Sequence, residues 1–167
     1  AQIIDALYEA SAAGVTVRLN VRGICCLRAG VPGLSANIEV ISIVDRFLEH
    51  GRILYFHRGG EPQLFITSAD WMPRNLDRRI ELLVPVEDPA CRDRLAALLA
   101  AGWADNVKAR RLCPDGHYEL RRPGTGESPV RSQFRFYEEV RQRNRRAALD
   151  RRQDFQPHRP EADTVPG

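Results

Sequence analysis

The stretch that decides the fold is residues 15–23, which read VTVRLNVRG. Every second one of the first seven residues is apolar, and this alternation predicts a β-strand with one buried face. Residues 2–13 carry apolar side chains at helical spacing and are followed by Gly14, which predicts a short amphipathic helix before the strand. A helix that leads into such a strand and then a polar glycine turn is typical of an open α/β sheet. Ligands gather beyond the carboxyl ends of strands in these sheets, and Arg22 stands at such an end.

The remaining elements follow from the same kind of reasoning. Further strands are predicted at residues 38–44, 52–56, 63–67, 80–86, 107–112 and 117–120. Residues 80–86 are nearly continuously apolar, as in a central strand that is buried on both faces. Helices are predicted over residues 88–102, where Asp88 and Pro89 suit the N-cap and first helical position, and from Ser128 onward.

These elements indicate an α/β fold, a mixed sheet flanked by helices, over residues 1–146. The 167 residues are 43% hydrophobic, which is enough for one ordinary core. Residues 147–167 are predicted to form a disordered tail, because proline and charge rise there while apolar periodicity ends. The chain begins at Ala1, almost directly in a helical pattern, so we expect it to be part of a longer protein.

Arginine supplies almost all of the positive charge, since Lys108 is the only lysine and the net charge is +3. This bias favours bidentate recognition of phosphate or carboxylate, although a GC-rich genome produces it as well. The four cysteines include no CxxC pair, so reduced, mostly buried thiols are expected and no metal ligand is assigned. No stretch approaches the roughly 20 apolar residues that span a bilayer, which predicts a cytoplasmic protein.

Four blocks carry the chemical signal. They are VRGICCL (21–27), RFLEH (46–50), TSADWM (67–72) and RNLDRR (74–79). Each places charged groups beside small residues and apolar strands. Phosphate binding needs that mixture, because a guanidinium meets two phosphate oxygens while apolar walls reduce screening by water.

Together the blocks resemble the C-terminal region of bacterial polyphosphate kinases of the ATP-dependent, histidine-phosphorylated type, in the same order and spacing, over residues 1–146. The resemblance implies the second of two phospholipase D-like domains. It also implies an enzyme that reversibly transfers the terminal phosphate of ATP to inorganic polyphosphate. The histidine that the family phosphorylates belongs to the preceding domain, so this fragment alone is expected to be inactive.

By this resemblance, Arg22 and His50 contact the ATP phosphates, and His50 is the catalytic candidate. His50 can donate to a phosphate oxygen or pass a proton to the departing ADP oxygen, and the two roles remain open. On spacing alone, Arg22 is equally well explained by a surface ion pair. Without the resemblance, the simpler explanation of His50 is a histidine at the start of a strand whose hydrogen bonds are satisfied by neighbouring residues.

Five further residues are predicted to support this site. Arg74, Arg78 and Arg79 are candidates for a polyphosphate channel, with a solvated charged turn as the alternative. Asn75 and Asp70 are expected to orient His50 or its loop.

The H-x-K-x4-D pattern of phospholipase D is altered here to His50, Arg52 and His57. Phosphate binding tolerates these changes better than phosphodiester hydrolysis does. The pattern therefore indicates a supporting half-site.

The resemblance also implies partners and a cofactor. Mg²⁺ is expected with the nucleotide, with its ligands outside this chain. The expected partners are ATP or ADP, inorganic polyphosphate and the preceding domains of the same enzyme. At full length we also expect a second copy of the protein. Peripheral association with the membrane stays open, and nucleic acid is not expected as a partner. Two alternatives remain: a phosphodiesterase of the phospholipase D superfamily with His50 as nucleophile, and nucleic-acid binding by the basic helix over residues 131–146.

Overall fold

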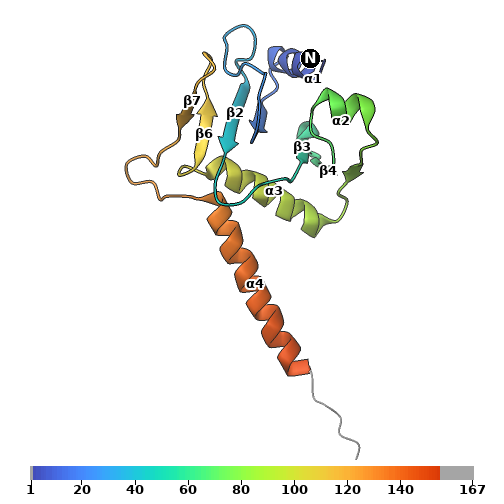
Figure 1. Ribbon diagram of the computed structural model, residues 1–167, viewed down its shortest axis with the longest axis vertical. Helices are drawn as coiled ribbons and strands as arrows, with labels where there is room; N and C mark the ends of the chain where they lie inside the picture. The colour runs from blue at the N-terminus through green and yellow to red at the C-terminus, as the bar shows by residue number, and fades with distance from the viewer. Residues whose placement is uncertain (1, 155–167) are drawn as a thin grey trace, which may run out of the picture. The chain divides into compact units, whose positions relative to one another are not determined.

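The computed structural model describes residues 2–154, which fall into two units divided after Gln133. In chain order the elements are α1 (Gln2–Ala12), β1 (Val17–Asn20), β2 (Ile38–Ile43), β3 (Ile53–Phe56), η1 (Arg58–Gly60), β4 (Gln63–Thr67), α2 (Pro73–Arg78), β5 (Leu83–Pro85), α3 (Pro89–Ala104), β6 (Ala109–Leu112), β7 (Tyr118–Leu120) and α4 (Ser132–Asp154). Figure 1 shows their arrangement. None of the helices that the structure describes is long and apolar enough to cross a bilayer.

The first sheet has the strand order β1-β2-β6-β7 and is mixed. β1 pairs with β2 in parallel, with Val17 opposite Ile38, whereas β6 and β7 continue the sheet antiparallel. This confirms the predicted α/β class with a mixed sheet.

β2 is the centre of the first unit because it is buried on both faces. Ile38 and Val40 pack on one face with Leu27 and Leu112, and apolar residues of α1 cover that cluster. Ile41 and Ile43 point to the other face, where they meet Ala109 and Trp103 of α3. Burial on both faces explains why Val40 and Ile41, which are adjacent and point to opposite faces, are both apolar.

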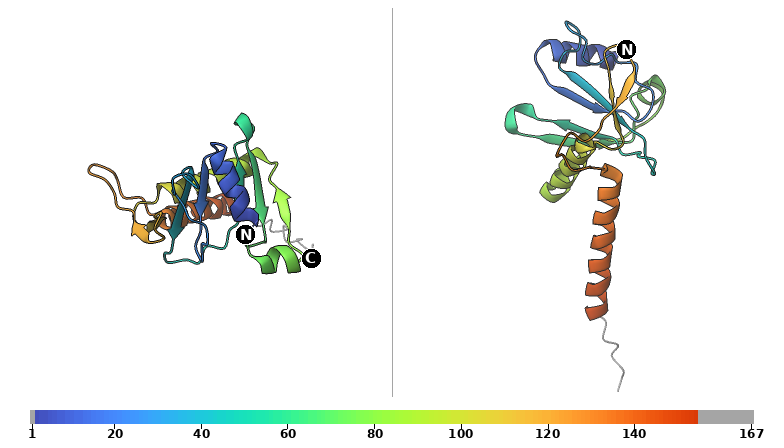
Figure 2. Two further views of the ribbon diagram at one scale, coloured as in Figure 1. Left: turned by 90° about the horizontal axis from the view of Figure 1, so that it is seen from above. Right: turned by 90° about the vertical axis from the view of Figure 1, so that its left-hand side faces the viewer.

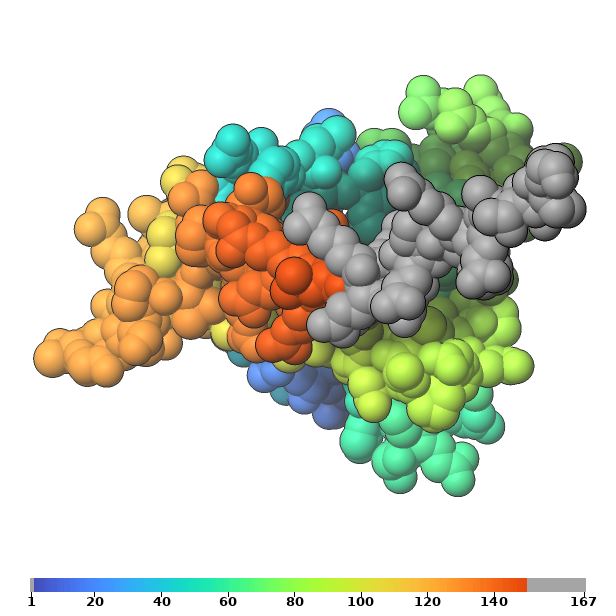
Figure 3. All heavy atoms as spheres, turned by 90° about the horizontal axis from the view of Figure 1, so that it is seen from below, coloured from blue at the N-terminus to red at the C-terminus, as the bar shows by residue number. Residues whose placement is uncertain are grey.

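α3 begins as predicted, with the Asp88 carboxylate accepting a hydrogen bond from the Cys91 amide at 2.7 Å. The helix lies at the surface of the first unit, where its yellow-green atoms are visible in Figure 3, and only Ala101 and Gly102 are buried.

A second, antiparallel sheet has the order β3-β4-β5, and its β3–β4 hairpin projects from the rest of the first unit (Figure 2). The prediction of a central strand over residues 80–86 was wrong. β5 covers only Leu83–Pro85, pairs with β4 alone and is exposed along its length. An apolar run is compatible with a strand that is buried on both faces, but it does not by itself show that other segments cover the strand.

Two further predictions need correction. Residues 73–78 form helix α2, with Pro73 in its first turn, where a charged turn was the alternative reading. α4 continues through residues 147–154, which are rich in good helix formers, whereas a disordered tail was predicted there. Residues 155–167 of that predicted tail lie outside the described residues.

Candidate functional site

Arg22 follows β1 directly and its side chain reaches a segment that is distant in sequence. The amide of Val21 still donates to Ile41 O at 2.8 Å, so Arg22 leaves the sheet at the end of a paired strand. Its Nη1 donates to the backbone carbonyl of Glu49 at 2.8 Å. The guanidinium therefore lies beside the backbone that leads into His50.

His50, Arg52 and Asp70 form a connected chain of side chains. Arg52 donates from Nε to Asp70 Oδ1 at 2.7 Å, and its Nη2 lies 2.9 Å from His50 Nε2. A weaker contact of 3.5 Å joins Arg52 Nη1 to the His50 carbonyl. Asp70 thus acts on His50 through Arg52, which sequence reasoning had not selected as a site residue although it occupies the position of the phospholipase D lysine.

The ion pair of Asp70 and Arg52 stabilises the charged form of both side chains. The hydrogen bond from Arg52 lowers the pKa of Asp70 more than burial raises it, and the guanidinium charges of Arg52 and Arg22 lower it further. In return, the hydrogen bond to Asp70 raises the pKa of Arg52. One carboxylate therefore faces two guanidinium groups, and the cluster keeps a net positive charge that suits an anion.

The segment before His50 is held by Gln133, a residue 83 positions further along the chain. The buried Gln133 amide donates to Phe47 O and to Glu49 Oε1, both at 2.8 Å, and its Oε1 accepts from Phe47 N at 2.8 Å. Sequence reasoning missed Gln133, because no local pattern links it to the RFLEH block.

The polar turn after β4 positions Asp70. Thr67 Oγ1 donates to Leu82 O at 2.8 Å and accepts from Ala69 N at 3.1 Å. Ser68 Oγ accepts from Leu82 N at 2.9 Å and donates to Glu81. These two hydroxyl groups connect the turn to the segment that leads into β5, mainly through hydrogen bonds to backbone groups.

The structure brings Asp70 to His50 but joins the other predicted support residues to neither. Arg74, Arg78 and Arg79 are exposed on or just after α2, and within residues 2–154 no ion pair engages them. Asn75 is 3% exposed, and its Oδ1 has no hydrogen-bond partner among the described residues. The channel role of these residues stays a prediction.

His57 lies away from the cluster. It is the residue before η1, at the end of β3 opposite to Arg52, in the tip of the β3–β4 hairpin. The three residues that match the phospholipase D pattern in sequence therefore do not gather in one place.

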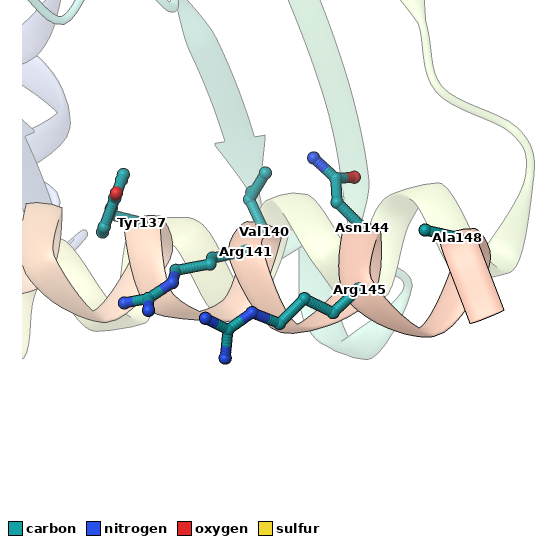
Figure 4. A pocket seen from close by; sticks show the side chains of 6 residues that line it. All are labelled: Tyr137, Val140, Arg141, Asn144, Arg145 and Ala148. Atoms are coloured by element: carbon teal, nitrogen blue, oxygen red, sulfur yellow. The ribbon is translucent and has the colours of Figure 1, made fainter.

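The second unit contributes a shallow hollow on α4, which Figure 4 shows from close by. Its lining residues are Tyr137, Val140, Arg141, Asn144, Arg145 and Ala148. All six belong to one helix at spacings of one, three or four residues, so they form a helix face and enclose no ligand site. The nucleic-acid alternative for this helix stays a prediction.

Comparison with known proteins identifies the family of the chain. The family described as polyphosphate kinase C-terminal domain 2 matches residues 1–133. The chain belongs to this polyphosphate kinase domain family. A polyphosphate kinase of Rhodopirellula baltica is 56% identical over 161 residues, which are 96% of this chain and 19% of that protein. One of Synechocystis is 56% identical over 135 residues, 81% of this chain and 18% of that protein.

A solved structure supports the same assignment. The crystal structure of polyphosphate kinase from Porphyromonas gingivalis matches with a TM-score of 0.80 and 44% identity, over 85% of this chain and 22% of that chain. The chain thus spans about a fifth of the length of the relatives that it matches. It has the fold of the C-terminal domain of polyphosphate kinases.

The cluster does not fit a magnesium ion in this polyphosphate kinase domain. Asp70 is engaged by Arg52, and the Glu49 carboxylate is engaged by Gln133. Octahedral magnesium sites require oxygen ligands, whereas the other side chains of the cluster are cations or an imidazole.

Proposed function

We propose that this domain supplies an ATP- and polyphosphate-binding half-site of a polyphosphate kinase, an enzyme that reversibly transfers the terminal phosphate of ATP to inorganic polyphosphate. The observation that carries the proposal is that Arg52 links His50 to the Asp70 carboxylate while Arg22 donates to the Glu49 carbonyl beside His50. Mg²⁺ would arrive with the nucleotide phosphates.

Arg22 is the side chain best placed to bind phosphate. It spends Nη1 on Glu49 O and is exposed, so its remaining N–H groups are available to phosphate oxygens. Arg52 spends its donors on Asp70 and His50, and its side chain is 19% exposed. We assign Arg52 a positioning role.

The contact with Arg52 also sets the tautomer of His50. A guanidinium only donates hydrogen bonds, so His50 Nε2 accepts and Nδ1 carries the proton. His50 is then a donor toward a phosphate oxygen through Nδ1. In the phosphodiesterase alternative His50 is a nucleophile. The contact between His50 Nε2 and Arg52 does not support that role, because it occupies the lone pair of this nitrogen.

The second sheet supports a place next to other domains of the same enzyme. Its exposed apolar side chains are Tyr55, Phe56, Ile66, Leu83 and Val84. Cross-strand pairing puts Ile66 and Val84 on one face and places Leu83 on the other, so both faces carry apolar surface. Exposed apolar surface of this kind marks an interaction site. The longer polyphosphate kinases supply candidate covering domains, and a second copy of the full-length enzyme in a homo-oligomer is another candidate. We also propose that the full-length enzyme is cytoplasmic, because its nucleotide substrate is cytoplasmic.

ATP binding by the chain tests the proposed half-site. Isothermal titration with ATP should show binding that Arg22→Gln weakens by about tenfold, the effect of losing one charge-assisted phosphate contact. Arg18→Gln is the matched control. Arg18 is exposed on β1, and its ion pair is a long one, with 3.9 Å between Arg18 Nε and Glu39 Oε2. Equal ATP affinity in the Arg22→Gln and unmodified proteins would contradict the assignment, and cleavage of a phosphodiester that His50→Ala abolishes would favour the phosphodiesterase.

A further inference from the structure

The turn between β6 and β7 gathers three side chains that are typical metal ligands. β6 ends at Leu112 opposite Tyr118, and the next cross-strand pair is Cys113 and His117. The Cys113 amide donates to His117 O at 2.9 Å, and Gly116 N donates to Cys113 O at 2.9 Å. Gly116 has φ +94°, a conformation that favours glycine and lets the turn close. Asp115 lies in the turn between the cysteine and the histidine.

The ligand atoms of these residues are already close together. Cys113 Sγ, an Asp115 carboxylate oxygen and an imidazole nitrogen of His117 all lie within 4.8 Å of one another. Zinc bonds of about 2.0–2.3 Å in a tetrahedron separate neighbouring ligand atoms by roughly 3.3–3.8 Å. Small side-chain rotations, about an ångström at each ligand atom, therefore suffice to enclose an ion.

A carboxylate and the solvent lie beside these three residues. Glu119 Oε2 lies 4.0 Å from Cys113 Sγ, although Arg111 Nη2 holds the same oxygen at 3.1 Å. Cys113 is 8% exposed, whereas Asp115 and His117 are exposed. An ion would enter from the solvent side and meet the thiol at the bottom of the turn.

We propose that Cys113, Asp115 and His117 bind a zinc-class divalent cation at the tip of the β6–β7 hairpin, with Glu119 or water as the fourth ligand. A thiolate and an imidazole select zinc over magnesium, so this site is chemically distinct from one for nucleotide-bound Mg²⁺. Bound there, the ion joins β6 to the exposed edge strand β7. Cysteine spacing alone did not indicate the site, because two of its three ligands are not cysteines.

The simpler alternative is a metal-free turn. Asp115 Oδ1 accepts from His117 N at 3.2 Å and lies 2.5 Å from His117 Nδ1, and this local pair explains both exposed residues without an ion. This pair does not involve the Cys113 thiol. Cys113 Sγ lies 4.0 Å from Arg111 O and 4.0 Å from Glu119 Oε2. The thiol therefore separates the two explanations.

Cobalt titration of the 167-residue chain under reducing conditions tests the proposal. One equivalent of Co²⁺ should produce the sulfur-to-cobalt charge-transfer absorption and tetrahedral d–d bands, and one equivalent of Zn²⁺ should remove both. Cys113→Ser should abolish the charge-transfer band. His117→Asn and Asp115→Asn should weaken Zn²⁺ binding by at least about 10- to 100-fold, the loss that even outer partners of metal ligands cause.

Matched controls use groups of the same type elsewhere. Cys91→Ser and His57→Asn alter exposed residues on α3 and before η1, and both variants should bind like the unmodified chain. The exposed position of Asp115 keeps the test valid if Cys113→Ser fails to fold. The proposal is overturned if no stoichiometric cobalt spectrum forms, if the charge-transfer band survives in folded Cys113→Ser, or if Cys91→Ser removes it.

Discussion

Arg52 and Asp70 form an ion pair of 2.7 Å that joins the entrance of β3 to the turn after β4. The pair holds the guanidinium plane, and the same guanidinium contacts His50. A carboxylate 20 residues away from His50 in sequence therefore orients it without touching it. Arg22 completes the cluster from the other sheet.

If the proposed half-site binds the ATP phosphates, Asp70→Asn in the full-length enzyme should lower kcat/KM for polyphosphate synthesis by about 10- to 100-fold, because His50 would no longer be held at the right distance from the phosphate. Arg52→Lys should lower activity as well, since an ammonium cannot hold both Asp70 and His50 in one plane. Steady-state kinetics at varied ATP concentration measure the effect. Asp77→Asn, an exposed carboxylate of α2, is the control, and an equal loss in that variant would refute a specific role for Asp70.

Asp105→Asn should destabilise the domain by about 3 kcal/mol. The substitution replaces one buried acceptor oxygen by an NH₂ group, which cannot accept the hydrogen bonds that the carboxylate accepts. The fully buried Asp105 Oδ1 accepts from the amides of residues 107, 108 and 109, and Oδ2 accepts from the amide and hydroxyl of Ser132. Urea unfolding measures the loss. Asp93→Asn on the exposed side of α3 should stay within about 0.5 kcal/mol of the unmodified chain.

Stability should fall on acidification. Burial raises the pKa of Asp105, but the hydrogen bonds from Lys108 and Ser132 outweigh it and lower that pKa below its ordinary value of 3.8. The hydrogen bond from Arg131 likewise lowers the pKa of Asp45. A folded-state pKa below the unfolded one contributes stability that is present above about pH 4 and is lost as the pH falls through the folded value.

Urea midpoints measured across the acidic range check this sign. The midpoint should change little between about pH 5 and pH 7 and then decrease below about pH 4. The decrease should be smaller in Asp105→Asn, which has one fewer such carboxylate. A midpoint that increases on acidification would show that these carboxylates do not stabilise the fold.

Leu83→Ser should affect the stability of the isolated domain and of the full-length enzyme differently. Leu83 is 58% exposed here, so the substitution should change the stability of the chain by no more than about 0.5 kcal/mol. If further domains cover β5 at full length, the same change should lower the melting temperature of that enzyme by several degrees. Leu149→Ser on α4, where Leu149 is 60% exposed, is the comparison variant, and calorimetry of both forms measures the difference.

Local patterns predicted most elements of the first unit. Alternation identified β1, and the Asp88–Pro89 pair correctly placed the start of α3. The apolar run that includes β5 predicted a central strand, but β5 is exposed, because an apolar sequence does not by itself show that another segment covers it. α2 was missed since six residues are too few to show helical periodicity.

The sequence by itself determined the α/β class and the family, because strand alternation and the four blocks are local properties of the chain. It also singled out Arg22, His50 and Asp70. Only the tertiary structure decided that Arg52 lies between His50 and Asp70 and that Gln133 holds the segment before His50. It also placed the ligand atoms of Cys113 and His117 within 4.8 Å of one another. The physical reason is that a hydrogen bond depends on where folded strands and turns bring two atoms, and residues far apart in the chain meet only once the sheets are assembled.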